Sequence, residues 1–108
     1  EQGVFKVTMN ESLAVALLTN LLKNAFVHNI DGGHIRITVT KNGITFRNSG
    51  VEHPLNKEHI FERFYQGSKK EGSTGLGLAI ADSICRLQHL NIKYYFEQNE
   101  HCFEISQS

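Results

Sequence analysis

EGSTGLGLAIADSICRL, residues 71–87, is the stretch around which the rest of the chain is organised. A polar run passes through Gly75 and Gly77 directly into apolar residues at helical spacing, which predicts a loop that opens an amphipathic helix. The first backbone amides of a helix have no partner within the helix, and they lie at the positive end of its dipole. Phosphate oxygens are common ligands of such amides, so the stretch predicts a phosphate-binding loop.

Length and composition indicate one domain, residues 1–108, of ordinary globular type. The chain is 40% hydrophobic and 20% charged, with 11 Lys and Arg against 11 Asp and Glu. The balanced charge gives little support to a nucleic-acid partner. No apolar run approaches the roughly 20 residues that cross a bilayer, and the amino end lacks a signal-peptide pattern, so we expect a cytoplasmic domain that does not itself enter a membrane. Cys85 and Cys102 have neither metal-ligand spacing nor the density of a disulfide scaffold, which predicts buried, reduced thiols.

The first predicted helix covers Ser12 to His28, with Asn10 as its N-cap and Glu11 in its first turn. Six apolar residues recur at helical spacing and are expected to face the core: Ala14, Leu17, Leu18, Leu21, Leu22 and Ala25.

Asn20 and Asn24 lie four residues apart and therefore share one face of this helix. Asparagine is a poor helix-interior residue, and burying its amide without partners is unfavourable. A solvated polar face is the simpler interpretation. We favour a ligand-facing role because the surrounding sequence leaves only Thr19 and Lys23 as clearly exposed positions.

Alternating apolar and polar residues predict short strands in the rest of the chain. We expect an edge strand at Gly3–Thr8, a hairpin of His34–Thr40 with Ile44–Arg47 around an Asn42-Gly43 turn, and a final hairpin of Asn91–Gln98 with Cys102–Ser106 around Asn99-Glu100.

Val51 to Thr74 is a long connection, which is typical of a functional lid or a disordered segment. Phe61 and Phe64 are spaced to pack on one side of a short helical turn, either to pin the lid or as a small satellite of the core. The inner face of the helix that follows is expected to carry Leu76, Ile80, Ala81, Ile84 and Leu87.

These elements predict an α+β two-layer sandwich. We expect a mixed, mostly antiparallel sheet of about five strands, covered on one face by two long helices and a short one. Two better-known phosphate motifs are excluded at Gly75. No Gly-Lys-Ser/Thr follows it as in a Walker A loop, and the third glycine and preceding strand of a dinucleotide fingerprint are missing.

Four ordered motifs carry a resemblance to a known family: NLLKNA at 20–25, Asn48-Ser49-Gly50, IFERF at 60–64 and TGLGLAI at 74–80. They resemble the N, G1, F and G2 boxes of the catalytic ATP-binding domain of sensor histidine kinases, over essentially the whole chain. The resemblance implies the Bergerat-type fold of gyrase-type, mismatch-repair and chaperone ATPases, with a long ATP lid and with ATP and Mg²⁺ as cofactors.

The resemblance also implies roles for individual residues. Asn24 would bind Mg²⁺ through its amide oxygen, and Asn20 would support the phosphates or the metal's waters. Asn20 and Arg63 would be the catalytic residues. The ATP-binding residues implied are Asn20, Asn24, His28, Asn48, Gly50, Tyr65, Thr74, Gly75, Leu76, Gly77 and Leu78.

Several positions depart from the family pattern. Asn48 replaces the usual Asp beside adenine, and because its amide can flip to donate to guanine we expect weaker base discrimination. Val27 and Gln66 replace a Lys and an Arg, so Arg63, Lys69 or Lys70 would have to supply positive charge near the phosphates. Glu52 lies near the place of a missing glycine, and Ser73 replaces another.

The resemblance implies a sensor histidine kinase that transfers the γ-phosphoryl group of ATP to a histidine. Gyrase-type hydrolases have a general-base Glu where this chain has Asn20, which cannot take a proton at neutral pH, so phosphoryl transfer is favoured over hydrolysis. The acceptor in such kinases is a His followed by an acidic residue, and none of the 6 histidines here is followed by Asp or Glu.

We therefore expect the acceptor on a separate dimerisation and phosphoacceptor domain of the same protein, with a response regulator as the next partner. The parent would be anchored in the bacterial inner membrane. Two alternatives stay open: a serine/threonine kinase of the anti-sigma type, and a degenerate nucleotide-binding or interaction module without turnover.

Overall fold

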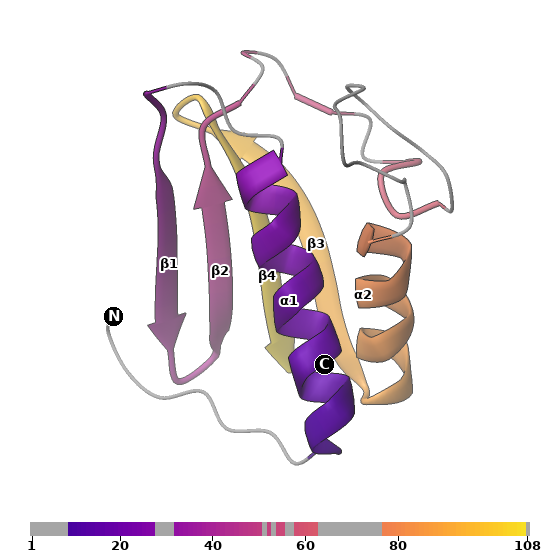
Figure 1. Cartoon of the computed structure of the whole chain (residues 1–108). Coiled ribbons are helices and arrows are strands. Elements are labelled where there is room, and N and C mark those ends of the chain that lie inside the picture. The colour runs from indigo at the N-terminus through magenta and orange to yellow at the C-terminus, as the bar shows by residue number, and fades with distance from the viewer. Residues whose placement is uncertain are drawn as a thin grey trace.

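A computed structural model of the chain describes residues 9–27, 32–50, 52, 54–55, 58–62 and 77–107. The predicted strand at 3–8 and most of the predicted lid lie outside these ranges. The elements in chain order are helix α1 (Glu11–Val27), strands β1 (Ile35–Thr40) and β2 (Gly43–Asn48), helix α2 (Gly77–Leu87), and strands β3 (Leu90–Glu97) and β4 (Glu100–Gln107) (Figure 1).

Two antiparallel hairpins form one sheet in the order β1-β2-β4-β3. The hairpins are joined by antiparallel pairing of β2 with β4, in which Phe46 lies opposite Phe103 and Asn48 opposite His101. The α+β class and a mostly antiparallel sheet are therefore confirmed. The fifth strand and any parallel pairing fall outside the described ranges.

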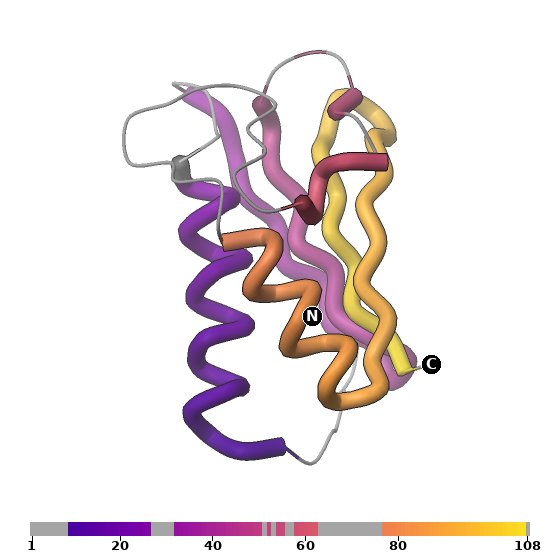
Figure 2. Tube along the Cα trace, turned by 90° about the vertical axis from the view of Figure 1, so that its right-hand side faces the viewer, coloured from indigo at the N-terminus to yellow at the C-terminus, as the bar shows by residue number. Residues whose placement is uncertain are grey.

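Both helices lie against the same face of the sheet, so the molecule has two layers (Figure 2). α1 packs over β2 and α2 over β3, and the helices also contact each other. The core lies between the layers and consists of Leu17, Leu21, Phe46, Ile60, Ala81, Ile84, Cys85, Leu90, Tyr94, Phe103 and Ile105.

α1 begins where its capping residues predict. The Asn10 side-chain oxygen accepts a hydrogen bond from the Ser12 amide at 2.7 Å, which satisfies one of the free amides of the first turn. Glu11 in that turn complements the helix dipole. The helix thus begins directly after the predicted cap and runs to Val27. His28, the last residue of the predicted helix, lies outside the described residues.

The predicted buried faces of the helices are wrong at three positions. Leu18, Ile80 and Leu87 are 41%, 43% and 67% exposed. In α2 the predicted Ala81 and Ile84 are buried, together with Ala79 and Cys85, and the small residues among them let the helix approach both α1 and β3 closely. Apolar residues surround much of each helix, so spacing alone does not define which side is inward. Thr19 and Lys23 are exposed as expected, but Leu18 and Phe26 are exposed as well.

Both predicted hairpins form, but each turn lies one residue earlier than predicted. The first turn is Lys41-Asn42, and Gly43 belongs to β2. A methyl group at residue 43 would lie 2.2 Å from the Ile105 carbonyl oxygen, so glycine is required by the close approach of β4. In the second turn Gln98 and Asn99 adopt positive φ of 54° and 62°, as a tight two-residue turn requires.

The short helix predicted around Phe61 is a hydrogen-bonded turn, in which the Glu62 amide donates to the His59 carbonyl at 2.9 Å. Phe61 nevertheless packs edge-on against Phe103, with ring centroids 6.2 Å apart. The predicted contact of Phe61 with the core is confirmed, and Phe64 lies outside the described residues.

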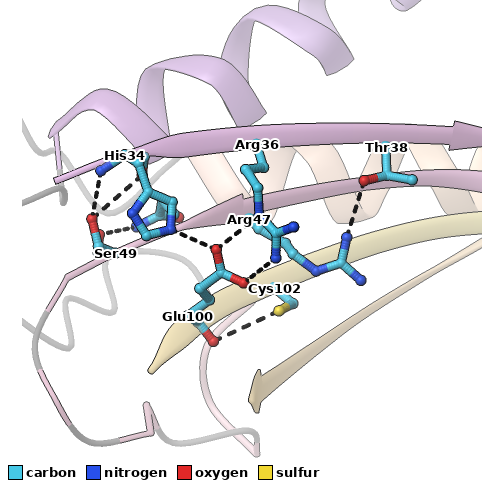
Figure 3. A network of polar contacts seen from close by, with 8 residues as sticks. His34, Arg36, Thr38, Arg47, Ser49, Glu100 and Cys102 are labelled. Carbon is cyan, nitrogen blue, oxygen red and sulfur yellow. Dashed lines mark hydrogen bonds and ion pairs between the residues drawn. The ribbon is translucent and has the colours of Figure 1, made fainter. Parts of the chain in front are cut away.

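Glu100, predicted to lie in a turn, is a buried strand residue at the centre of a polar network (Figure 3). One carboxylate oxygen is 2.6 Å from His34 Nε2 and accepts from Arg36 Nε at 3.1 Å, and the other accepts from Arg36 Nη2 at 2.6 Å. Because side chains alternate along a strand, this network lies on the sheet face opposite the helices. It ties β1 to the start of β4 across the intervening β2.

Both cysteines are buried and free, as predicted. Burial raises the pKa of the Cys85 thiol to about 11, and burial likewise raises the pKa of Cys102. Within the described ranges, neither helix is long and apolar enough to cross a membrane.

Gly43→Ala tests the close approach of β2 and β4. The added methyl group would overlap the Ile105 carbonyl, so we expect the free energy of unfolding in urea to fall by about 2–4 kcal/mol. Gly32→Asn is the control, because residue 32 has open space around it and Asn tolerates its φ of +75°. A Gly43→Ala protein as stable as the control would contradict the assigned register.

Glu100→Gln tests the polar network through pH. The hydrogen bond from Arg36 lowers the pKa of Glu100 below its ordinary value of 4.5, an effect that burial partly opposes. A group whose pKa is lower in the folded state stabilises the fold above its unfolded pKa, and this stabilisation is lost as the pH falls through the folded value. Between about pH 5 and 3, unfolding midpoints should therefore fall more steeply for the wild type than for Glu100→Gln. Glu97→Gln, at an exposed position, should keep the wild-type slope.

Candidate nucleotide-binding site

Asn20 and Gly77 bring the two helices together at the predicted site. The Asn20 amide nitrogen donates to the Ala16 carbonyl at 2.8 Å, which fixes the side chain along α1. A methyl group at residue 77 would lie 3.2 Å from the Asn20 side-chain oxygen, so that oxygen points at the first residue of α2. The structure thus places a residue of the N-box motif against a residue of the G2-box motif.

Asn24 lies one turn further along the same side of α1 and is half-buried. Its side chain makes no hydrogen bond to other residues in the part of the chain that the structure describes. Asn20 and Asn24 therefore share one helix face as predicted, and Asn20 is the one of the two that donates to a backbone carbonyl.

Asn48 ends β2 with its side chain on the helix-facing side of the sheet, in line with Phe46. Only 2% of the residue is exposed, and its amide nitrogen donates to the Ser49 carbonyl at 2.7 Å. This bond leaves the amide oxygen as the group that can accept from a ligand.

Ser49 holds the end of β2 in place. Its hydroxyl accepts from the His34 amide at 2.9 Å, and its own amide donates to the His34 carbonyl at 3.2 Å. His34 in turn contacts Glu100, so the network on the opposite sheet face supports this end of the site (Figure 3).

Three motif segments meet at the same end of the molecule. Figure 1 shows α1 and β2 ending towards the top of the view, and α2 starting at its upper end, further down. Gly50 is buried and Leu78 is half-buried against the core. The remaining candidates lie outside the described residues: His28, Arg63, Tyr65, Thr74, Gly75 and Leu76.

The donor set at α1 suits a hard cation that also binds phosphate. Mg²⁺ prefers oxygen ligands and commonly takes one or two from protein and the rest from water and substrate phosphates. Within the described ranges, no cluster of three or more His, Cys, Asp or Glu side chains could hold a metal ion. The half-buried Asn24 amide oxygen fits a magnesium ion shared with a triphosphate, in which the phosphates balance the charge.

Sequence reasoning missed a second polar group beside the site. The Tyr94 hydroxyl accepts from the Leu55 amide at 2.9 Å and lies 2.7 Å from His101 Nδ1. Both side chains are on the helix-facing side of the sheet and 4% exposed. The sequence offered one signal for this group: Tyr94 is a tyrosine at an inward-facing position of a predicted strand, and a buried tyrosine hydroxyl needs a hydrogen-bond partner.

A family model for histidine kinase-, DNA gyrase B- and HSP90-like ATPases matches residues 9–106 of the chain. The chain is 44% identical over 84 residues to the sensor histidine kinase RppB of Synechocystis, which covers 69% of the chain and 18% of that protein. It is 40% identical over 90 residues to the heme sensor protein HssS of Staphylococcus aureus, which covers 79% of the chain and 20% of that protein. The chain thus spans about a fifth of the length of these relatives.

Solved structures show the same architecture. The catalytic domain of the histidine kinase ThkA aligns with 92% of the chain and 68% of its own length, at a TM-score of 0.75 and 27% identity. The mycobacterial sensor histidine kinase MprB, at 23% identity and a TM-score of 0.73 over 92% of the chain and 72% of its own, shares the fold. The chain therefore belongs to the family of histidine kinase-, DNA gyrase B- and HSP90-like ATPases, in the branch formed by the catalytic domains of sensor histidine kinases.

Proposed function

We propose that this domain binds ATP with Mg²⁺ and transfers the γ-phosphoryl group to a histidine on a separate dimerisation and phosphoacceptor domain. The observation that carries the proposal is the approach of Asn20 to Gly77, at the end of the molecule where β2 delivers Asn48. The face of α1 that carries Asn20 and Asn24 can then contact the metal, the start of α2 the phosphates, and the end of β2 the base.

Each of these three parts has a distinct role in the proposal. The Asn24 amide oxygen binds Mg²⁺. Asn20, where α1 meets the start of α2, supports the phosphates. The first amides of α2, from Gly77 and Leu78, offer donors to phosphate oxygens. The Asn48 amide oxygen accepts from the base. Mg²⁺, when bound, would neutralise charge that develops on the phosphates.

The remaining expected parts complete the proposal. Residues 3–8 add a fifth strand to the sheet, and the segment from Val51 to Thr74 forms a lid over the nucleotide, with His28, Tyr65, Thr74, Gly75 and Leu76 as further contacts. Arg63 supplies positive charge near the phosphates. The domain acts in the cytoplasm, in a parent protein anchored in the bacterial inner membrane, and a response regulator receives the phosphoryl group from the histidine.

Transfer is favoured over hydrolysis because of Asn20. An amide cannot take a proton from water at neutral pH, so the residue at this place cannot serve as a general base. Phosphoryl transfer depends mainly on positioning and charge, which amide and backbone groups can provide for an acceptor held in line.

Asn24→Ala tests the metal assignment by titration calorimetry with a non-hydrolysable ATP analogue. We expect the wild type to bind more tightly with Mg²⁺ than without it, and Asn24→Ala to lose most of that difference, about tenfold in affinity, because one oxygen ligand is removed. Asn91→Ala, at an exposed position on β3, should keep the magnesium dependence.

A wild type that binds without magnesium dependence would refute the metal role of Asn24. A wild type that does not bind the analogue would favour the module without turnover, for which the substitutions at Val27, Gln66 and Ser73 already provide some support. Incubation with labelled ATP and the parent's phosphoacceptor domain then separates a kinase from a silent nucleotide binder.

Comparison of ATP with GTP tests base recognition by Asn48. Flipping the amide to donate to guanine would break the hydrogen bond to the Ser49 carbonyl and turn the amide oxygen towards that carbonyl. The replacement of Asp by Asn predicts weaker discrimination, but because this hydrogen bond favours the amide oxygen as the acceptor, we expect ATP to bind about tenfold more tightly than GTP. Equal affinities in competition titrations would show that the amide flips.

A further inference from the structure

The Tyr94–His101 pair lies next to the residue that meets the base in the proposed site. His101 is the cross-strand neighbour of Asn48, on the same face of the sheet. Tyr94 follows on the adjacent strand, its hydroxyl 2.7 Å from His101 Nδ1 and its ring stacked on the imidazole at 5.9 Å and 20°. Phe96 also contacts the imidazole, with ring centroids 4.9 Å apart.

The same pair reaches the chain again after it has left β2. The Tyr94 hydroxyl accepts a hydrogen bond from the backbone amide of Leu55 at 2.9 Å. Leu55 itself packs against the core as a half-buried side chain. One end of the segment from Asn48 to Leu55 is therefore paired with His101, and the other end is bonded to Tyr94.

Packing alone does not account for these residue types. Phenylalanine at either position would fill a similar volume without a polar atom, and burying a hydroxyl or an imidazole is unfavourable unless its hydrogen bonds are made. Here the Tyr94 hydroxyl binds the backbone amide of Leu55, and His101 Nδ1 lies within hydrogen-bond distance of that hydroxyl. Their effect is to fix the position of the Leu55 backbone.

We infer that Tyr94 and His101 are positioning residues of the nucleotide site. They fix the backbone at Leu55 and lie beside Asn48, and thereby hold the Asn48 amide oxygen towards the base. The inference rests on the proposed function, because it assigns the pair to the binding of the same nucleotide.

Tyr94→Phe tests the inference, with Tyr95→Phe as the matched control. Tyr95 is the next residue on β3, on the opposite face of the sheet, and its hydroxyl makes no hydrogen bond in the described part of the chain. Two readouts are needed: amide hydrogen exchange at Leu55 by NMR without nucleotide, and affinity for a non-hydrolysable ATP analogue with Mg²⁺.

In Tyr94→Phe we expect exchange at Leu55 to rise about tenfold and the dissociation constant to rise about three- to tenfold, because one buried hydrogen bond is lost. Tyr95→Phe should change neither value. His101→Phe, which keeps a ring and removes Nδ1, should change both in the same direction as Tyr94→Phe. Melting temperatures of all variants separate these effects from a general loss of folding.

The arms of the experiment have different meanings. Unchanged Leu55 exchange in Tyr94→Phe would overturn the anchoring of the segment. Faster exchange with unchanged affinity would overturn the role in nucleotide binding. Failure of the wild type itself to bind the analogue would overturn the proposed function and this inference together, whereas a change confined to the variants concerns the pair alone.

Discussion

One face of the sheet has to hold both the apolar core and the polar site, and the strand register divides it between them. The row that contains Phe46 and Phe103 lies beneath the helices and is buried. The next row along the strands contains Asn48 and His101, at the end of the sheet where the motif segments meet. A shift of one residue between β2 and β4 would move each set of side chains to the opposite face. The pairing of these two strands therefore fixes the fold and the site together.

The opposite face of the sheet reinforces the same end of the molecule. Glu100 joins β1 to β4 through His34 and Arg36, while Ser49 bonds to both backbone groups of His34. The strand end that carries Asn48 is thus held from behind by ionic and backbone contacts. On the helix side, His101 lies opposite Asn48, and the Tyr94 hydroxyl next to it accepts from the Leu55 amide.

Local patterns predicted most of the elements, and their success has a physical reason. The cap at Asn10 and the spacing of apolar residues define α1. Asn20 and Gly77, which belong to two motifs far apart in the sequence, lie close together, as the resemblance implies. The N-box and G2-box motifs could be linked from sequence because the family resemblance predicts that both face the same ligand. The metal and base roles of the individual residues remain predictions.

Long-range packing explains what could not be predicted. Gly43 suggested an Asn-Gly turn, but its glycine is required by a carbonyl of β4, which is more than sixty residues away. Glu100 looked like a turn residue because its partners, His34 and Arg36, are equally distant in sequence. Leu18 and Ile80 were assigned to the core because periodicity measures apolar character and not which neighbour covers a helix.

The strand order also has a consequence for the length of the chain between the two central strands. β2 and β4 are neighbours in the sheet, although α2 and β3 lie between them in the sequence. The entropy of closing such a long excursion grows only with the logarithm of its length, so that doubling it costs about 0.6 kcal/mol. The segment before α2 can therefore gain or lose residues with little effect on the stability of the sheet. Its length is free to change while the register between β2 and β4 stays constant.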